Sequence, residues 1–156
     1  MRFRVVVVGK DKHDPLIDSG DDYLGRRQHY FPTELVAVKE EPARSKSDLS
    51  RVKSLEADRL QKAAPRASLF VVLDEAGQNI SSEQLASRVG RWADEGRAEV
   101  AFFIGGPNGI APELRQNAAL VLSLSRMTLP HRLARVVLLE QLYRASTILR
   151  GEPYHK

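Results

Sequence analysis

The centre of the chain reads Glu99-Val100-Ala101-Phe102-Phe103-Ile104-Gly105-Gly106-Pro107-Asn108-Gly109, an apolar run that passes directly into a glycine-rich one. The apolar residues predict a buried strand over Glu99–Ile104. Glycines at a strand end let the backbone approach a ligand closely and supply N–H donors, so this junction is a candidate site. The spacing matches neither a Walker A loop nor the GxGxxG fingerprint, and a plain tight turn is the alternative interpretation.

Strand-like and helix-like stretches alternate on both sides of this segment. Apolar runs predict strands at Arg2–Val8, Glu34–Val38, Ser68–Leu73, Glu99–Ile104 and Leu120–Leu124. Amphipathic or capped stretches predict helices at Pro15–Tyr30, at Asp48–Ala64, from Ser81 to near Gly96, from Pro112, and from Pro130 to about Arg150, with a mobile loop over Lys39–Lys46. This order predicts an α/β fold with a mostly parallel sheet flanked by helices, in a single domain over residues 1–156.

Ligands of such sheets bind beyond the carboxyl ends of the strands. Three strand ends are therefore candidates for the site: Leu73-Asp74, Ile104-Gly105-Gly106 and Leu124-Ser125-Arg126.

The composition excludes several classes of protein. Hydrophobic residues make up 42% and charged residues 28% of the 156 residues, as in ordinary globular proteins. There is no cysteine, so disulfides, thiolate chemistry and cysteine-based zinc sites are excluded. No apolar run approaches the ~20 residues that span a bilayer, and the run Val5–Val8 is too short for a signal peptide. We expect a cytoplasmic protein without a metal site.

Positive charge gathers at the end of the chain. Residues 115–156 contain seven basic and two acidic side chains, a net charge of +5 within a total of +4, and six of the seven cations are arginine. Arginine favours planar, bidentate contact with phosphate or carboxylate. This charge indicates either a nucleic-acid partner or a solvated basic face.

The segment before the last helix carries further candidates. Thr128 could cap that helix, with Pro130 in its first turn. Arg132 and Arg135 would then lie at the end where the helix dipole disfavours cations, which suggests a bound anion such as RNA phosphate; extension into solvent is the alternative. The helix is apolar on more than one stripe, so we expect burial on two sides, either by a second subunit or in the core of one chain.

Two further residues have a functional and a structural interpretation. His131 is either a catalyst or a hydrogen-bonded structural residue. Tyr154 either stacks on an unpaired base or belongs to a frayed tail. Neither a serine nucleophile elbow nor an aspartate dyad occurs in the sequence, which fits group transfer by positioning of a cofactor rather than hydrolysis.

At these segments the chain closely resembles the ribosomal RNA large subunit methyltransferase H family of the SPOUT class. The resemblance covers essentially the full length, is strong from Ile104 onward and is weak between Lys39 and Ala67. It is carried by Phe103–Gly109, Leu122–His131, Arg135–Ala145 and Pro153–Lys156, with support from Val7–Lys10 and Val72–Asp74.

The resemblance implies a deep trefoil knot near the C-terminus, a homodimer, and S-adenosylmethionine held in the knot. The positions that match the family's cofactor pocket are Leu73, Gly105, Gly106, Ser125, Arg126, Met127, Thr128, Leu129 and Pro130. The implied reaction is methylation of N3 of a pseudouridine in helix 69 of 23S rRNA, in the assembled ribosome.

The chemistry of that reaction suggests roles for the basic residues. The N3–H of pseudouridine must lose its proton, so a base or a positive field is required. We expect His131, Arg132 and Arg144 to supply the field, with His131 a candidate base. The residues expected to contact RNA are Arg126, Arg135, Tyr154 and His155.

Two other functions fit the same pattern. One is a SPOUT enzyme that acts on tRNA or on another rRNA base. The other is a non-enzymatic RNA- or nucleotide-binding module, which would not bind S-adenosylmethionine.

Overall fold

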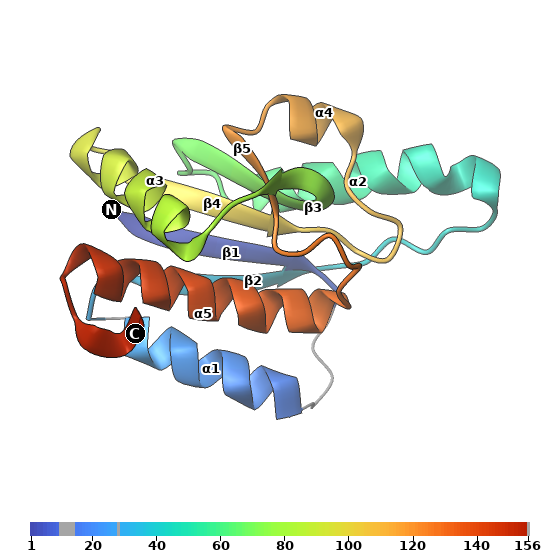
Figure 1. Cartoon of the computed structure of the whole chain (residues 1–156). Helices are drawn as coiled ribbons and strands as arrows, with labels where there is room; N and C mark the ends of the chain where they lie inside the picture. Colours follow the sequence, from blue (N-terminus) through green and yellow to red (C-terminus); the bar gives the residue numbers. More distant parts are fainter. Residues whose placement is uncertain (10–14, 28, 156) are drawn as a thin grey trace.

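The computed structural model describes residues 1–9, 15–27 and 29–155, except for the side chains of Ile17, Arg27 and His155. Five parallel strands form one sheet in the order β2-β1-β4-β3-β5, with helices on both faces (Figure 1). The elements are β1 (Arg2–Val8), α1 (Pro15–Arg27), β2 (Thr33–Val38), η1 (Lys46–Asp48), α2 (Leu49–Lys62), β3 (Leu69–Asn79), α3 (Ser82–Asp94), β4 (Glu99–Ile104), α4 (Pro112–Gln116), β5 (Leu120–Ser123), α5 (His131–Leu149) and η2 (Pro153–His155). The predicted α/β class is confirmed. In the part of the chain described, no helix is long and apolar enough to cross a membrane.

The two faces of the sheet carry separate apolar clusters, because successive side chains of a strand point to opposite faces. Val5 and Val7 face the cluster that α3 and α5 cover, whereas Val6 and Val8 face the cluster under α2 and α4. All four valines are fully buried or nearly so. Burial on both faces explains why β1 is a continuous apolar run rather than an alternating one.

The long helix α5 is covered on two sides by other helices of its own chain. It packs between α1 and α3 against the sheet (Figure 1). Leu138, Leu139 and Leu142 are completely buried, as is Ala145. One chain therefore covers much of the apolar surface of α5, whereas Leu133, Val136 and Val137 stay half-buried. The second subunit stays a prediction.

The start of α5 differs from the prediction. Pro130 is the N-cap, and no side chain caps the helix. Thr128 instead donates a hydrogen bond to Oε2 of Glu75, so its predicted role as the helix cap is wrong. The capping box predicted from Ser81 and Gln84 is confirmed in α3.

Strand β3 continues past the predicted end at Leu73. The register with β5 shifts between Leu73 and Gln78, and the strand resumes pairing as far as Asn79. A Cβ on Gly77 would lie 2.6 Å from the backbone oxygen of Val121. Glycine at this position thus allows the backbones of β3 and β5 to approach each other after the irregularity. The sequence there is polar and resembles a turn, which is why the strand was predicted to end earlier.

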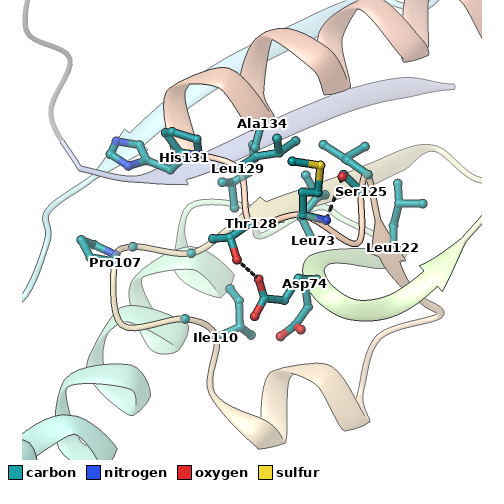
Figure 2. Close-up of a pocket in the computed structure, with 18 residues that line it drawn as sticks. Leu73, Asp74, Pro107, Ile110, Leu122, Ser125, Thr128, Leu129, His131 and Ala134 are labelled. Carbon is teal, nitrogen blue, oxygen red and sulfur yellow. Dashed lines mark hydrogen bonds between the residues drawn. The ribbon is translucent and has the colours of Figure 1, made fainter.

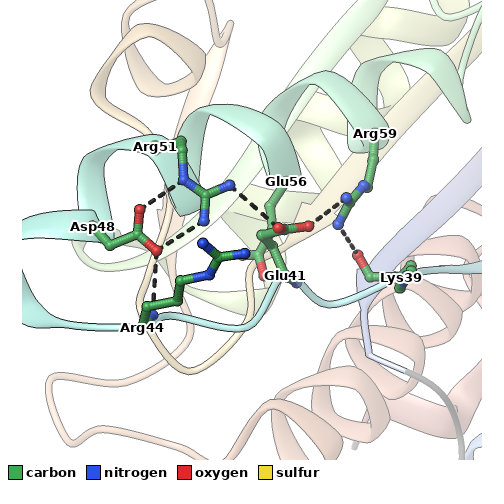
Figure 3. Close-up of polar contacts among 7 residues, drawn as sticks. All are labelled: Lys39, Glu41, Arg44, Asp48, Arg51, Glu56 and Arg59. Carbon is green, nitrogen blue, oxygen red and sulfur yellow. Dashed lines mark hydrogen bonds and ion pairs between the residues drawn. The ribbon is translucent and has the colours of Figure 1, made fainter.

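The segment that joins β2 to α2, predicted to be a mobile loop, is held by ion pairs (Figure 3). Arg51 donates two hydrogen bonds to Asp48, at 2.6 and 2.8 Å, and also contacts Glu41. Arg59 bonds Glu41 and the carbonyl oxygen of Lys39. Other boundaries shift by a few residues: α1 ends at Arg27 rather than Tyr30, and α2 begins at Leu49 after a short 3-10 turn.

Candidate functional site

A cavity of about 590 Å³ lies at the carboxyl edge of the sheet, where the three predicted strand ends meet (Figure 2). The chain reaches it from β3, β4 and β5, which are neighbours in the sheet. The residues that line it are Leu73, Asp74, Glu75, Ile104, Gly105, Gly106, Pro107, Gly109, Ile110, Leu122, Leu124, Ser125, Met127, Thr128, Leu129, Pro130, His131 and Ala134. All the predicted cofactor-binding residues except Arg126 line this cavity.

The glycine-rich segment forms both a tight turn and one wall of the cavity, so its two interpretations are compatible. The backbone N–H of Gly109 donates to the carbonyl oxygen of Gly106 at 3.0 Å, and Gly109 has a φ of 82°. A Cβ on Gly105 would lie 2.8 Å from Cδ1 of Ile110. A side chain at Gly105 would therefore push against Ile110, which also lines the cavity.

The segment Ser125–Pro130 forms the opposite wall. The hydroxyl of Ser125 accepts a hydrogen bond from the backbone N–H of Met127 at 2.9 Å, which folds the segment into a turn. Thr128 ties that turn to Glu75 at the end of the first half of β3 (Figure 2). Met127 is 77% exposed at the rim.

The cavity is acidic. Among the described residues that line it, Asp74 and Glu75 are the only carboxylates, and there is no lysine or arginine. Asp74 accepts hydrogen bonds from the backbone N–H of Ala76 at 2.9 Å and from Arg115 at 3.2 Å, which fixes its carboxylate. Apolar walls, backbone polar groups and carboxylates suit a ligand that combines an apolar or aromatic part with a positive charge.

The first turn of α5 brings His131 to the mouth of the cavity, as predicted. A Cβ on Gly9, at the end of β1, would lie 3.8 Å from its Nε2. Arg132 follows it and is half-buried. Arg135 is only 2% exposed, because α1 covers it, and a Cβ on Gly20 would lie 3.8 Å from its Nε. Arg135 is therefore a buried residue of this chain, and its contact with RNA stays a prediction.

Arg144 lies elsewhere. It follows His131 by 13 residues on α5, which corresponds to about 20 Å along a helix. Its guanidinium donates to Oε1 of Glu140 at 2.9 and 2.6 Å, and its Cζ lies 4.9 Å from the ring centroid of Tyr154. The Tyr154 hydroxyl lies within hydrogen-bond distance of two acceptors, Glu140 at 3.3 Å and Tyr23 at 3.5 Å. We call Tyr23, Glu140, Tyr143, Arg144 and Tyr154 the tyrosine–arginine cluster.

The charges of this cluster are interdependent. The hydrogen bond from Arg144 to Glu140 raises the pKa of the guanidinium, which stays protonated. Burial, then the hydrogen bond with Tyr23, raises the pKa of Tyr154, so the phenol stays neutral and can donate. The ring of Tyr143 packs against Tyr154 with centroids 4.7 Å apart. The tail is thus docked on α5 rather than frayed; the side chain of His155 lies outside the described residues.

Sequence reasoning missed Glu75, Glu140 and Tyr23. Glu140 and Arg144 are four residues apart on a predicted helix, and that spacing was a usable signal for their pairing. Tyr23 meets Tyr154 across 131 positions, and no local pattern reveals such a contact.

Comparison with known proteins identifies the family. The family described as "Predicted SPOUT methyltransferase" matches residues 1–155. A ribosomal RNA large subunit methyltransferase H of Anaeromyxobacter dehalogenans strain 2CP-1 is 48% identical over 157 residues and one of Gemmatimonas aurantiaca is 45% identical over 159, each covering 100% of both chains.

Solved structures share the fold at lower identity. A probable methylase family protein of Haemophilus influenzae has a TM-score of 0.61 at 15% identity and covers 99% of this chain and 70% of that one. A probable methyltransferase of Bordetella pertussis has a TM-score of 0.57 at 15% identity and covers 92% and 95%. The full-length matches in sequence, on a chain whose three strand-end segments build one cavity, show that this protein belongs to the ribosomal RNA large subunit methyltransferase H family of SPOUT methyltransferases.

Proposed function

We propose that this protein transfers the methyl group of S-adenosylmethionine to N3 of a pseudouridine in helix 69 of 23S rRNA within the assembled ribosome. The observation that carries the proposal is the acidic, backbone-lined cavity at Leu73, Gly105 and Ser125–Pro130 in a chain of this family. The proposed function further implies a single domain over residues 1–156 and a location in the cytoplasm, where assembled ribosomes are found. It also implies a trefoil knot through which the segment after β5 passes.

The lining residues fit the cofactor. S-adenosylmethionine carries a sulfonium and an ammonium group, and when bound it supplies an activated methyl group. The carboxylates of Asp74 and Glu75 are the complementary charges at the cavity. The backbone around Gly105 and Gly106 offers polar groups and a close approach, while Leu73 and Leu129 offer apolar contact.

The protein's own part is to place the nucleotide and to make its N3–H easier to ionise. The pseudouridine imide is weakly acidic, so a positive field lowers the cost of its anion. His131 lines the cavity, and Arg132 is the next residue of α5. Both would act on a base aimed at the bound methyl group. Arg144 and Tyr154 would hold the nucleotide by charge and by stacking.

These two sets of residues cannot meet in one chain, because Arg144 lies about 20 Å along α5 from His131. We therefore propose a homodimer in which the tyrosine–arginine cluster of one subunit faces the cavity of the other. This would complete the site without any rearrangement of α5.

The dimer can be tested by mixing two inactive variants. A Gly105→Val variant should lack the cofactor site, and an Arg144→Ala variant should lack the nucleotide site. Heterodimers formed from both retain one intact composite site, so the mixture should recover about a quarter of wild-type activity. A mixture that stays inactive, although mass spectrometry shows that subunits exchange, would contradict the shared site.

The reaction is tested by mass spectrometry of helix 69 from ribosomes of a strain that lacks this protein. We expect the N3-methylpseudouridine to disappear and to return when the gene is restored. Purified protein with S-adenosylmethionine should also methylate ribosomes from the deletion strain. Persistence of the modification after deletion would exclude this target and favour another rRNA or tRNA base; failure of the folded protein to bind S-adenosylmethionine in calorimetry would favour a non-enzymatic module.

A further inference from the structure

A second cavity, of about 560 Å³, opens between the last residues of β3 and the outer side of α3. It shares no lining residue with the first. Its lining consists of Gln78, Asn79, Ile80, Gln84, Ser87, Arg88 and Arg91, which we call the α3 groove. Within the described chain, its lining thus combines two guanidinium groups, three primary amides and a hydroxyl with no carboxylate.

The groove side chains are arranged rather than scattered. Gln84, Arg88 and Arg91 follow one another at spacings of four and three residues, which places them on one side of the helix. Arg88 donates a hydrogen bond to Oε1 of Gln78 at 3.0 Å, across the groove. The side-chain carbonyl oxygen of Gln84 belongs to the capping box, in which it accepts a hydrogen bond from the backbone N–H of Ser81 at 2.9 Å.

A chain of hydrogen bonds joins this groove to the wall of the cofactor cavity. Asn79 donates from Nδ2 to the carbonyl oxygen of Ser123 at 3.2 Å. The hydroxyl of Ser123 donates to the carbonyl oxygen of Ser125 at 2.9 Å. Ser125 in turn organises the turn at Met127. The groove therefore ends at the base of the segment that carries the cofactor wall, and Arg126 is the next cation along the chain.

The two cavities have opposite charge, and this decides what each can bind. The carboxylates of Asp74 and Glu75 at the first would repel phosphates. The guanidinium groups of Arg88 and Arg91 at the second would attract them. Primary amides and hydroxyls are the other groups that proteins use on the sugar–phosphate backbone and on base edges.

We propose that the α3 groove binds the sugar–phosphate backbone of the rRNA segment next to the methylated nucleotide. The inference rests on the proposed function for the identity of the RNA. The groove would fix the strand while the target base enters the first cavity, so its residues contribute to ribosome affinity and not to cofactor affinity. Contacts to phosphate position a protein and make its affinity depend on salt.

The test is a double variant, Arg88→Gln with Arg91→Gln, assayed for binding to ribosomes from the deletion strain over a range of KCl concentrations. Loss of two phosphate contacts should weaken binding about tenfold at moderate salt and reduce the slope of log affinity against log salt by about 1.4. The affinity for S-adenosylmethionine, measured by calorimetry, should stay unchanged.

The matched control is Lys62→Gln with Arg66→Gln, which removes the same charge from two exposed residues at the end of α2 and just beyond it, in the layer on the other face of the sheet. This control should keep wild-type affinity and slope. Equal ribosome affinity and equal salt slope in the two double variants would overturn the proposal. Dissociation of the dimer by the Arg88 and Arg91 substitutions would also overturn it. The alternative ligand of the groove is an acidic ribosomal protein. In that case the Arg88 and Arg91 double variant would bind isolated helix 69 RNA with the same affinity as the wild type, and this result would also overturn the proposal.

These outcomes separate the groove from the proposed function. If wild-type protein methylates helix 69 and the groove variant binds normally, only the groove is wrong. If the variant loses affinity although helix 69 is not the methylated RNA, the groove stands and the target is wrong.

Discussion

The strand-end cavity, which is the proposed cofactor site, and the tyrosine–arginine cluster lie at opposite parts of α5 and are built in different ways. The cavity is made of backbone turns at the ends of three neighbouring strands, with Gly105 and Ser125 as typical components. The cluster is made of long side chains, in which Arg144 and Tyr154 depend on Glu140. A backbone-built site is set by the fold and is damaged by added atoms, whereas a side-chain-built site is damaged by lost or misplaced groups.

The sharpest way to break the cluster alone is Arg144→Lys, which keeps the charge but loses the fork that bonds Glu140 and the plane that stacks on Tyr154. If the cluster holds the reacting nucleotide, turnover should fall about 100-fold, as for loss of a transition-state donor. The affinity for S-adenosylmethionine should stay unchanged, because Arg144 does not line the cavity.

The matched control for this change is Arg150→Lys. Arg150 also stacks on a tyrosine, with its Cζ 4.7 Å from the centroid of Tyr30, but it lies outside both regions. It should keep wild-type turnover in the same methylation assay. Equal losses in both variants would mean that the effect reports the stability of the helix end rather than the chemistry.

Strands β3 and β5, whose ends carry the cavity, should be destabilised when an atom is added where their backbones approach each other. Gly77→Ala would place a methyl group 2.6 Å from the backbone oxygen of Val121, where neither strand can yield easily. We expect a loss of about 2 kcal/mol in the free energy of unfolding, or about 4–8 °C in melting temperature for a chain of this size. Gly25→Ala, where a Cβ would meet nothing within 4 Å, should show no comparable loss in the same thermal scan.

The same contrast explains what the sequence could predict. Local signals placed the end of β4 at Ile104, the end of β5 to within one residue, and the point at Leu73 where β3 stops pairing with β4. Parallel order alone then brings these segments to one edge. The glycine-rich junction and the capping box at Ser81 are local signals too. The cavity, as the product of topology and short motifs, was therefore largely predictable.

Features that depend on contacts between distant segments were not predictable. The extension of β3 past Gly77 depends on pairing with β5. Thr128 bonds Glu75 instead of capping α5, a choice made by the fold and not by the helix. Arg135 looked like a surface cation until α1 was placed over it, and Tyr23 joins the cluster only because α1 and the tail pack on the same helix.

The acidity of the cavity gives a smaller and more specific effect. Glu75→Gln keeps an acceptor for Thr128 but removes a charge from the lining of the proposed cofactor site. We expect the affinity for S-adenosylmethionine to fall about fivefold, as for loss of a partly exposed charge interaction. The affinity for S-adenosylhomocysteine, which lacks the sulfonium charge, should fall less.

Calorimetry with both ligands at two salt concentrations measures this difference, since a screened charge effect shrinks at high salt. Thr128→Val is the informative companion, because it removes the bond to Glu75 and leaves the charge. If Glu75→Gln weakened the binding of both ligands equally, Glu75 would determine the shape of the cavity rather than its preference for a positively charged ligand.

The smallest effect is expected far from both regions, at the ion pairs that hold the segment between β2 and α2 (Figure 3). The hydrogen bonds from Arg51, and then that from the backbone N–H of Arg44, lower the pKa of Asp48 to about 2. Because the folded pKa is depressed, this stabilisation is present above the unfolded pKa of about 3.9 and is lost as the pH falls toward 2. Asp48→Asn should therefore be slightly less stable than the wild type at pH 6, and the two unfolding curves should converge by pH 2. If the difference in stability between Asp48→Asn and the wild type persisted at pH 2, Asp48 would act through packing and not through its charge. The segment would then resemble the backbone-built cavity more than the side-chain-built cluster.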